Sequence, residues 1–279
     1  MRKISKETIV EEVKNLVIRA NRELPKDVLS ALQSALDVEE SPLGKRVISE
    51  ILENAQIAKD EKLPLCQDTG TAVFFVEMGH DAKIEDEDIV SLIERGTAEG
   101  YREGFLRSSK CDPLTRKNSG DNTPATVHLS FVSGSEIKIS FLAKGGGAEN
   151  MSRLFMLSPS EGKEGVIKQV VETVDSAGAK ACPPLIVGVG LGGTFDTAPI
   201  AAKRALLREV GVANPDEKIA AVEVEIFNEI NKLGIGPMGY GGRVTALAVH
   251  IETRPCHIAS LPVAVNLQCH SARPGVVVI

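Results

Sequence analysis

Apolar residues recur at intervals of three and four up to about residue 62, a spacing typical of amphipathic helices. Ile9, Val13 and Leu16 fall on one face of such a helix, and Thr8 and Glu11 have the spacing of a capping box. Ser41 directly before a proline marks a further helix start. The N-terminal part, about 1–62, is therefore predicted to be helical.

From about residue 63 the pattern changes to strands that alternate with helices. Residues 63–68 are expected to form a loop, followed by a strand over 72–76 and a helix from about Asp86 to Gly104. Alternating apolar and polar residues over 127–131 and 137–141 predict a β-hairpin with one buried face. Further helices are expected over 166–174, 198–207 and 219–230, and further strands over 185–187 and, as a pair, within 244–265. The prediction is one α/β domain, 1–279, with an α/β part from about 63 to 279 and a mixed or antiparallel sheet surrounded by helices.

Composition excludes several classes of function. The formal charge of the 279 residues is -6 and basic residues are scattered, which argues against a nucleic-acid partner. No apolar run approaches the roughly 20 residues that a membrane helix needs, and the N-terminus lacks a secretory apolar core. We therefore expect a cytoplasmic protein without membrane contacts. In that reducing compartment its five cysteines favour metal ligation, catalysis or burial over disulfides.

Three of the cysteines lie where the chain must turn: Cys66, Cys182 and Cys269. Three thiolates from distant segments suit an iron–sulfur cluster better than a local metal knuckle, which uses closely spaced pairs. Three sulfurs for a four-iron cluster leave one iron open, and an open iron is a Lewis acid that can bind a small hydroxy acid. Cys111 and Cys256 are interpreted as bystanders.

A glycine-rich segment offers a different interpretation. Residues 188–193 match the Gly-x-Gly-x-x-Gly dinucleotide fingerprint between a predicted strand and a predicted helix. The acidic partner expected about 20 residues later is missing, because Glu209 falls at a helix end. A dinucleotide-binding protein is therefore kept only as an alternative. Glycines near Gly146 could let backbone amides point at an anion or could be ordinary flexible turn residues.

Four polar residues are candidates for chemistry. Gln67 and Asp68 follow Cys66 directly, so Asp68 could move a proton or, alternatively, only close a turn before the next glycine. Arg107 could clamp a substrate carboxylate or be a solvated surface arginine. His257 could act in proton transfer or be an ordinary core histidine.

Several motifs together carry a resemblance to a known family. These are Cys66-Gln67-Asp68-Thr69-Gly70-Thr71, Lys117-Asn118-Ser119-Gly120-Asp121-Asn122-Thr123-Pro124, Lys144-Gly145-Gly146-Gly147-Ala148-Glu149-Asn150, Cys182-Pro183-Pro184 and Cys269-His270-Ser271-Ala272-Arg273. In this order they resemble class I, iron–sulfur fumarate hydratases and the related L-tartrate dehydratases.

The resemblance implies a hydro-lyase that reversibly hydrates fumarate to malate in the tricarboxylic acid cycle, or else an L-tartrate dehydratase. It implies a 4Fe-4S cluster on Cys66, Cys182 and Cys269 whose open iron is easily lost in air. It also implies a site lined by Gln67, Asp68, Arg107, Gly146 and His257, with Asp68 and His257 as the proton-transfer pair.

The resemblance also implies a partner. Single-chain members continue well beyond the segment that matches Cys269, into a second domain with further site residues. The chain is therefore expected to be an alpha subunit that needs a separate beta subunit, in a hetero-oligomer with two-fold symmetry. The alternative from another class is a non-catalytic scaffold in which a metal only staples the fold.

Overall fold

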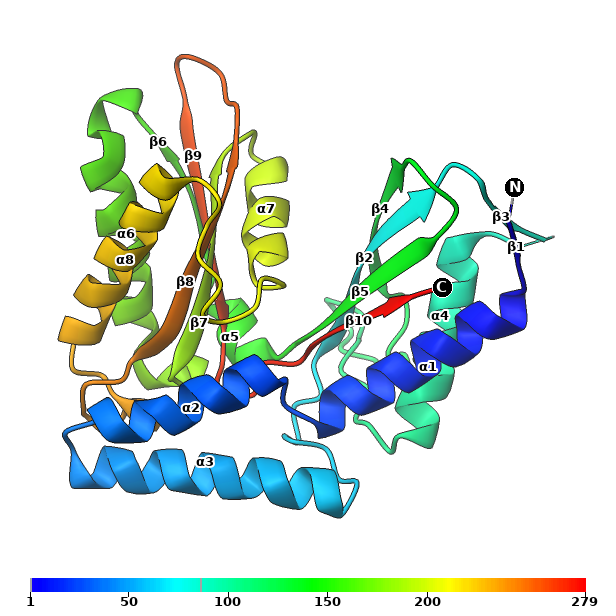
Figure 1. Cartoon of the computed structure of the whole chain (residues 1–279), viewed down its shortest axis with the longest axis horizontal. Coiled ribbons are helices and arrows are strands. Elements are labelled where there is room, and N and C mark those ends of the chain that lie inside the picture. The colour runs from blue at the N-terminus through cyan, green and yellow to red at the C-terminus, as the bar shows by residue number, and fades with distance from the viewer. Residues whose placement is uncertain (1, 86) are drawn as a thin grey trace. The chain divides into compact units, whose positions relative to one another are not determined.

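A computed structural model describes residues 2–85 and 87–279 of the chain (Figure 1). The contacts between residues divide the chain into two compact units. Unit 1 comprises Met1–Pro25, Ala55–Gly146 and Arg273–Ile279, and unit 2 comprises Lys26–Asn54 and Gly147–Ala272. Both units combine helices with a four-stranded sheet, which confirms the predicted α/β class.

The sheet of unit 1 has the strand order β10-β5-β2-β4. Strand β2 runs parallel to β4 and antiparallel to β5, and β5 pairs antiparallel with β10. Helices α1 and α4 contribute to the apolar core on one face of this sheet. The elements are β1 (Arg2–Ile4), α1 (Lys6–Arg22), β2 (Thr71–Gly79), β3 (Ala82–Ile84), α4 (Ile89–Glu103), β4 (Thr126–Val132), β5 (Ile137–Lys144) and β10 (Pro274–Val278).

The start of α1 differs from the predicted capping box. Ser5 is the N-cap, and its hydroxyl accepts a hydrogen bond from the backbone N–H of Thr8 over 3.1 Å. The N-cap thus lies three residues before the expected cap, Thr8, because a serine was available where the backbone leaves strand β1. Helix α4 begins after Asp88, and the Asp86 of the prediction lies outside the described residues.

The predicted hairpin of residues 127–131 with 137–141 is wrong. Both segments are strands, β4 and β5, but β2 lies between them. The alternating pattern identifies a half-buried strand without identifying its neighbour. Five consecutive residues of β2 are buried, so β2 takes a central position, whereas β4 is an edge strand with four exposed residues at its end.

The sheet of unit 2 has the order β6-β9-β7-β8, with β7 and β8 parallel and β9 antiparallel to both β6 and β7. Figure 1 shows α6 and α8 on one face of this sheet and α7 on the other. The elements are α2 (Lys26–Val38), α3 (Pro42–Asp60, continuing into unit 1), α5 (Gly146–Asn150), β6 (Arg153–Leu157), η1 (Pro159–Glu161), α6 (Gly162–Ala177), η2 (Gly178–Ala181), β7 (Leu185–Gly192), α7 (Thr197–Ala205), α8 (Glu217–Lys232), η3 (Pro237–Gly239), β8 (Ala246–Arg254) and β9 (Leu261–Gln268).

The Gly-x-Gly-x-x-Gly segment lies mostly inside β7 and not in a turn after it. A Cβ atom on Gly188 would be 2.2 Å from the carbonyl oxygen of Ala202, and one on Gly190 would be 2.0 Å from that of Ala198. These glycines therefore let α7 approach the sheet closely. The packing accounts for the motif without a phosphate and disfavours the dinucleotide alternative.

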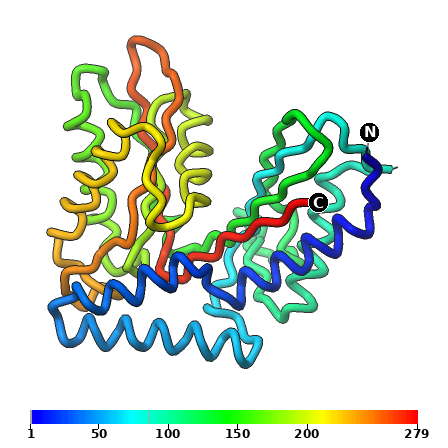
Figure 2. Tube along the Cα trace, viewed as in Figure 1, coloured from blue at the N-terminus to red at the C-terminus, as the bar shows by residue number. Residues whose placement is uncertain are grey.

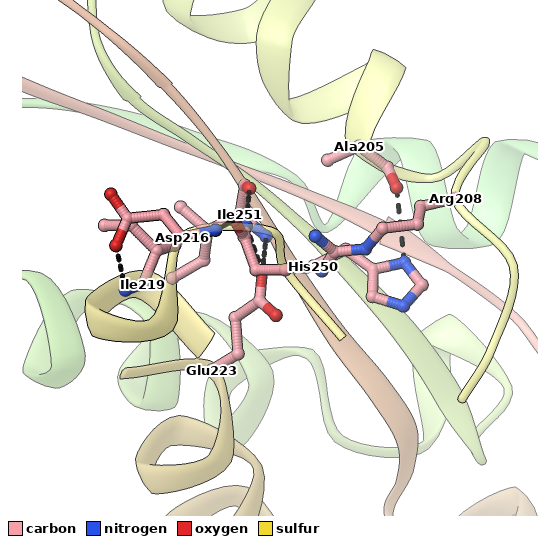
Figure 3. Close-up of polar contacts among 8 residues, drawn as sticks. Ala205, Arg208, Asp216, Ile219, Glu223, His250 and Ile251 are labelled. Atoms are coloured by element: carbon pink, nitrogen blue, oxygen red, sulfur yellow. Dashed lines mark hydrogen bonds and ion pairs between the residues drawn. The ribbon is translucent and has the colours of Figure 1, made fainter. Parts of the chain in front are cut away.

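A buried polar cluster joins α8 to β8 in unit 2 (Figure 3). The carboxylate of Glu223 accepts hydrogen bonds from the backbone N–H of Ile251 over 2.6 Å and from Arg208 over 2.5 Å. Nearby, His250 donates from Nδ1 to the carbonyl oxygen of Ala205 over 3.2 Å. Burial, with a smaller contribution from the positive charge of Arg208, lowers the pKa of His250 to about 4, so the ring is neutral at pH 7.

Each unit is assembled from separate stretches of the chain. The helices of the N-terminal part are shared, since α1 belongs to unit 1 and α2 to unit 2. Figure 2 shows the C-terminal strand beside the green strand β5 of unit 1. Whether the units fold together as one domain stays a prediction. No helix within the described residues is both long and apolar enough to cross a bilayer.

Candidate functional site

The loop of Cys66 lies between α3 and β2 in unit 1, as predicted. Its thiol is half-buried, and the sulfur accepts a hydrogen bond from the backbone N–H of Asp68 over 3.4 Å. Gly70 closes the loop with a φ of 71°, in the left-handed region. A Cβ atom there would be 2.6 Å from the backbone of Lys144, so both the conformation and the space require glycine.

The carboxylate of Asp68 is held by two backbone amides. Oδ1 accepts from the N–H of Gly70 over 3.1 Å, which is the turn-closing hydrogen bond considered for it. Oδ2 accepts from the N–H of Gly146 over 2.7 Å. The amide of Gly146 is thus directed at Asp68, and the carboxylate is fixed in one orientation beside Cys66.

A layer of buried side chains in unit 1 holds the backbone of this loop by hydrogen bonds to its carbonyl oxygens. The hydroxyl of Tyr101 donates to the carbonyl oxygens of Thr69 and Gly70 over 2.9 and 3.1 Å. The buried amide of Asn122 donates to the carbonyl oxygen of Gly70 over 3.2 Å. Burial raises the pKa of Tyr101, so this hydroxyl remains a neutral donor.

Arg273 completes this layer. Its side chain is 1% exposed and donates from Nη1 to the carbonyl oxygen of Asp68 over 2.7 Å and to Oδ1 of Asn21 over 3.2 Å. Sequence reasoning missed Tyr101, Asn122 and Arg273 as supports. The only available signal was that Asn122 and Arg273 fall within the unusual motifs, since a buried arginine has no periodicity of its own.

Arg107 follows α4 and lies beside the Cys66 loop. The hydroxyl of Thr69 donates to the backbone carbonyl of Arg107 over 2.7 Å. Arg107 lines a cavity of about 420 Å³ within unit 1, a volume in the range of small-molecule sites. The cavity is lined by Gln67, Asp68, Arg107, Ser108, Ser109, Cys111, Arg116 and Asn118.

The other two cysteines lie on adjacent segments of unit 2. Cys182 follows η2 in a left-handed conformation with φ 56°, and Cys269 directly follows β9. The backbone N–H of His270 donates to the carbonyl oxygen of Cys182 over 3.2 Å, and Nδ1 of the same residue lies 3.1 Å from that oxygen. The structure therefore brings the Cys182 and Cys269 segments together.

His257 lies elsewhere in unit 2. It is exposed in the loop that joins β8 to β9, where Nδ1 accepts from the backbone N–H of Ala259 over 3.1 Å. The eight residues of β9 separate this loop from Cys269. At about 3.4 Å per residue the strand is about 27 Å long, so within unit 2 His257 does not contact the two thiols. Figure 1 shows the loop at the upper end of the sheet.

The thiols have the chemistry that an iron–sulfur cluster requires. None of the five cysteines, all of which are described, is in a disulfide, and Cys66, Cys182 and Cys269 are half-buried. Among the described residues, no three His, Cys, Asp or Glu side chains form a group that could hold a metal ion. Thiol sulfurs are nevertheless the type of donor atom that binds an iron–sulfur cluster.

A larger cavity of about 1140 Å³ lies between α2 and α8 and contains none of the predicted site residues.

Comparisons with known proteins agree with these motifs. The profile of the family described as Fumarate hydratase (Fumerase) matches residues 10–278. A Methanocaldococcus jannaschii protein, provisionally named L(+)-tartrate dehydratase subunit alpha, is 42% identical, with 95% of this chain and 96% of that protein covered. The L(+)-tartrate dehydratase subunit alpha of Escherichia coli O157:H7 is 33% identical, with 97% and 90% covered, and that of strain K12 is 32% identical with the same coverage.

Proposed function

The chain belongs to the fumarate hydratase family, and from this premise we propose that it is the alpha subunit of a hydro-lyase acting on a four-carbon dicarboxylate. The first proposed reaction is the reversible hydration of fumarate to malate. The observation that carries the proposal is the carboxylate of Asp68, which lies two residues after Cys66 and is held by the amides of Gly70 and Gly146. It shares a cavity with Arg107.

The proposed cofactor is a 4Fe-4S cluster on Cys66, Cys182 and Cys269. When bound, such a cluster supplies an open iron that polarises the hydroxyl group of the substrate. The half-buried thiols and the contact between His270 and the Cys182 carbonyl support this ligand set.

The side chains of unit 1 perform the remaining steps. Arg107 binds a substrate carboxylate, because a guanidinium matches its two oxygens. The exposed amide of Gln67 hydrogen-bonds the substrate in the same cavity. Asp68 takes the proton from the carbon beside a carboxylate, as its fixed orientation favours. Gly146 contributes by orienting Asp68, and any direct contact of its own with substrate stays a prediction.

His257 was predicted to share the proton transfer with Asp68. Its position at the other end of β9 from Cys269 gives this role no support within unit 2. The pairing therefore stays a prediction, and the proposed mechanism rests on Asp68. His257→Asn is expected to lower turnover only if a part of the assembly outside unit 2 brings the imidazole ring of His257 to the substrate.

We also propose a separate beta subunit in a two-fold symmetric hetero-oligomer. The relatives are named as alpha subunits, which supports a second chain. The dicarboxylate would need cationic and hydroxyl groups from that chain in addition to those of unit 1.

A second candidate reaction is the dehydration of L(+)-tartrate. It is favoured by the names of the similar proteins from Methanocaldococcus jannaschii and Escherichia coli. L-Malate and L(+)-tartrate are both 2-hydroxy dicarboxylates, so the side chains described here serve either reaction.

The test is anaerobic purification with the partner subunit, followed by iron and sulfide analysis and assays with fumarate, L-malate and L(+)-tartrate. We expect about four irons per chain and turnover of one of these substrates. Protein that holds iron but converts none of them would support the non-catalytic scaffold instead. Robust turnover by this chain alone would contradict the need for a beta subunit.

A further inference from the structure

The cavity of unit 1 contains a second arginine that the proposed mechanism does not use. Arg116 lines the same cavity as Arg107, together with Asp68 as its one carboxylate. A dicarboxylate carries two negative charges, whereas Arg107 and Asp68 alone would leave the cavity without net positive charge. Arg116 supplies the missing cation, so the lining becomes electrostatically suited to a dianion.

A small hairpin holds Arg116 in place. Cys111 and Asn118 form an antiparallel bridge, and the N–H of Asp112 donates to the carbonyl oxygen of Lys117 over 2.9 Å. The carboxylate of Asp112 accepts from the backbone N–H of Thr115 over 2.7 Å. The N–H of Arg116 itself donates to the carbonyl oxygen of Asp112 over 3.1 Å. The arginine therefore projects from a hydrogen-bonded turn.

The backbone of Arg116 has a φ of 60°, in the left-handed region where glycine is favoured. A non-glycine residue at such a position is strained, and the strain persists because the hydrogen-bonded turn around Arg116 fixes its backbone. Asn118 connects the hairpin to the cavity wall, since Nδ2 donates to the carbonyl oxygen of Ser108 over 3.0 Å. Arg116 is exposed, its Nη1 donates to the carbonyl oxygen of Pro113 over 3.4 Å within the same turn, and the residue lines the cavity from this position.

We propose that Arg116 is a carboxylate-binding residue that acts with Arg107 and sets the preference of this cavity for dicarboxylates over monocarboxylates. The inference rests on the proposed function for the identity of the substrate. It goes beyond that function by assigning the binding of the second substrate carboxylate to a residue of this chain.

Cys111 provides a test that needs no turnover, because its half-buried thiol lines the same cavity. The full chain is pulsed with iodoacetamide under anaerobic conditions, and labelling of Cys111 is measured by peptide mass spectrometry. The probes are fumarate, L-malate and L(+)-tartrate as dicarboxylates and lactate as the monocarboxylate. Exposed Cys256 is the internal reference in the same sample.

We expect the dicarboxylates to slow labelling of Cys111 but not of Cys256, and lactate to protect at least tenfold more weakly. Arg116→Gln should raise the half-protecting dicarboxylate concentration about tenfold, the loss typical of one charge-assisted hydrogen bond. It should also reduce the difference between dicarboxylates and lactate. Lys110→Gln removes one positive charge from the same loop without changing the cavity lining, and it should stay within about twofold of wild type.

The proposal is overturned if Arg116→Gln leaves protection and selectivity unchanged, or if Lys110→Gln weakens protection as much. Failure of the proposed function gives a different result. In that case the dicarboxylates protect Cys111 in an Arg116-dependent way, while the complex with its partner subunit converts none of them.

Discussion

Arg273 donates a hydrogen bond from Nη1 to the backbone carbonyl oxygen of Asp68 over 2.7 Å. A guanidinium buried to 1% exposure thereby holds the residue that we propose as the catalytic base. Because the bond goes to the backbone, it fixes the loop and leaves the carboxylate to the amides of Gly70 and Gly146. The buried arginine is thus a support for the loop and not a substrate ligand.

Removal of this support should destabilise unit 1. Arg273→Met leaves the Asp68 carbonyl and Asn21 without their donor, so we expect the free energy of unfolding to fall by about 2–4 kcal/mol. Urea denaturation measures the loss, and hydrogen exchange should be faster in residues 65–70. Arg22→Met is the matched control, because Arg22 also donates to one backbone carbonyl, that of Gly104 over 3.3 Å. A loss no larger than that of the control would contradict the prediction.

Asp68→Asn should separate proton transfer from loop structure. The amide keeps an oxygen that can accept from Gly70 or Gly146, but it cannot take a proton at neutral pH. We expect kcat to fall by about 10²–10⁴ and the unfolding free energy to change by about 1 kcal/mol or less. Steady-state assays of the loaded complex measure the first effect. Turnover within a factor of ten of wild type would show that another group is the base.

Substitution of one proposed ligand should prevent assembly of the proposed cluster. Replacing Cys66, Cys182 or Cys269 with serine is expected to abolish the brown absorption of anaerobically reconstituted protein, because serine is a poor ligand for iron–sulfur clusters. Cys256→Ser is the control and should keep the absorption and the iron content. Full iron and sulfide content in Cys182→Ser would exclude that residue from the ligand set.

His250 should make unit 2 sensitive to acid. Its folded pKa of about 4 lies below the ordinary value of 6.5, so the unfolded chain binds the proton first as the pH falls. The contribution of neutral His250 is complete above pH 6.5 and is lost as the pH falls to 4, by about 3 kcal/mol. Urea denaturation across this range should show a shallower decrease for His250→Gln than for wild type.

Local patterns in the sequence were sufficient to predict most helices and strands of the fold. Helices α6 and α8 and strands β7 to β9 occur where apolar periodicity predicts them, and Gly178 is the C-cap of α6. Strand partners were not predictable, because β4 and β5 have the same alternating pattern whether or not they pair. The sequence of the short strand β10 has no pattern that would distinguish a strand from an irregular C-terminal segment.

The candidate site, like the fold, could be predicted from the sequence only in part. Cys66, Asp68 and Arg107 were predicted because their residue types carry chemistry, and unit 1 brings Asp68 and Arg107 to one cavity. Tyr101 and Arg273 support that site through backbone carbonyls, which depend on tertiary packing and leave no sequence motif. His257 is only twelve residues from Cys269 in the sequence, but the extended strand β9 between them places the two residues at opposite ends of the strand.

The discontinuity of unit 1 has a consequence for biosynthesis. Arg273–Ile279 belongs to unit 1 but is translated after all of unit 2. A ribosome therefore completes residues 147–272 before β10 can join β5 and before Arg273 can reach the Asp68 carbonyl. Until then the Cys66 loop lacks its buried arginine. In the proposed enzyme, delivery of iron to Cys66 is accordingly expected to follow translation of the chain and not to accompany it.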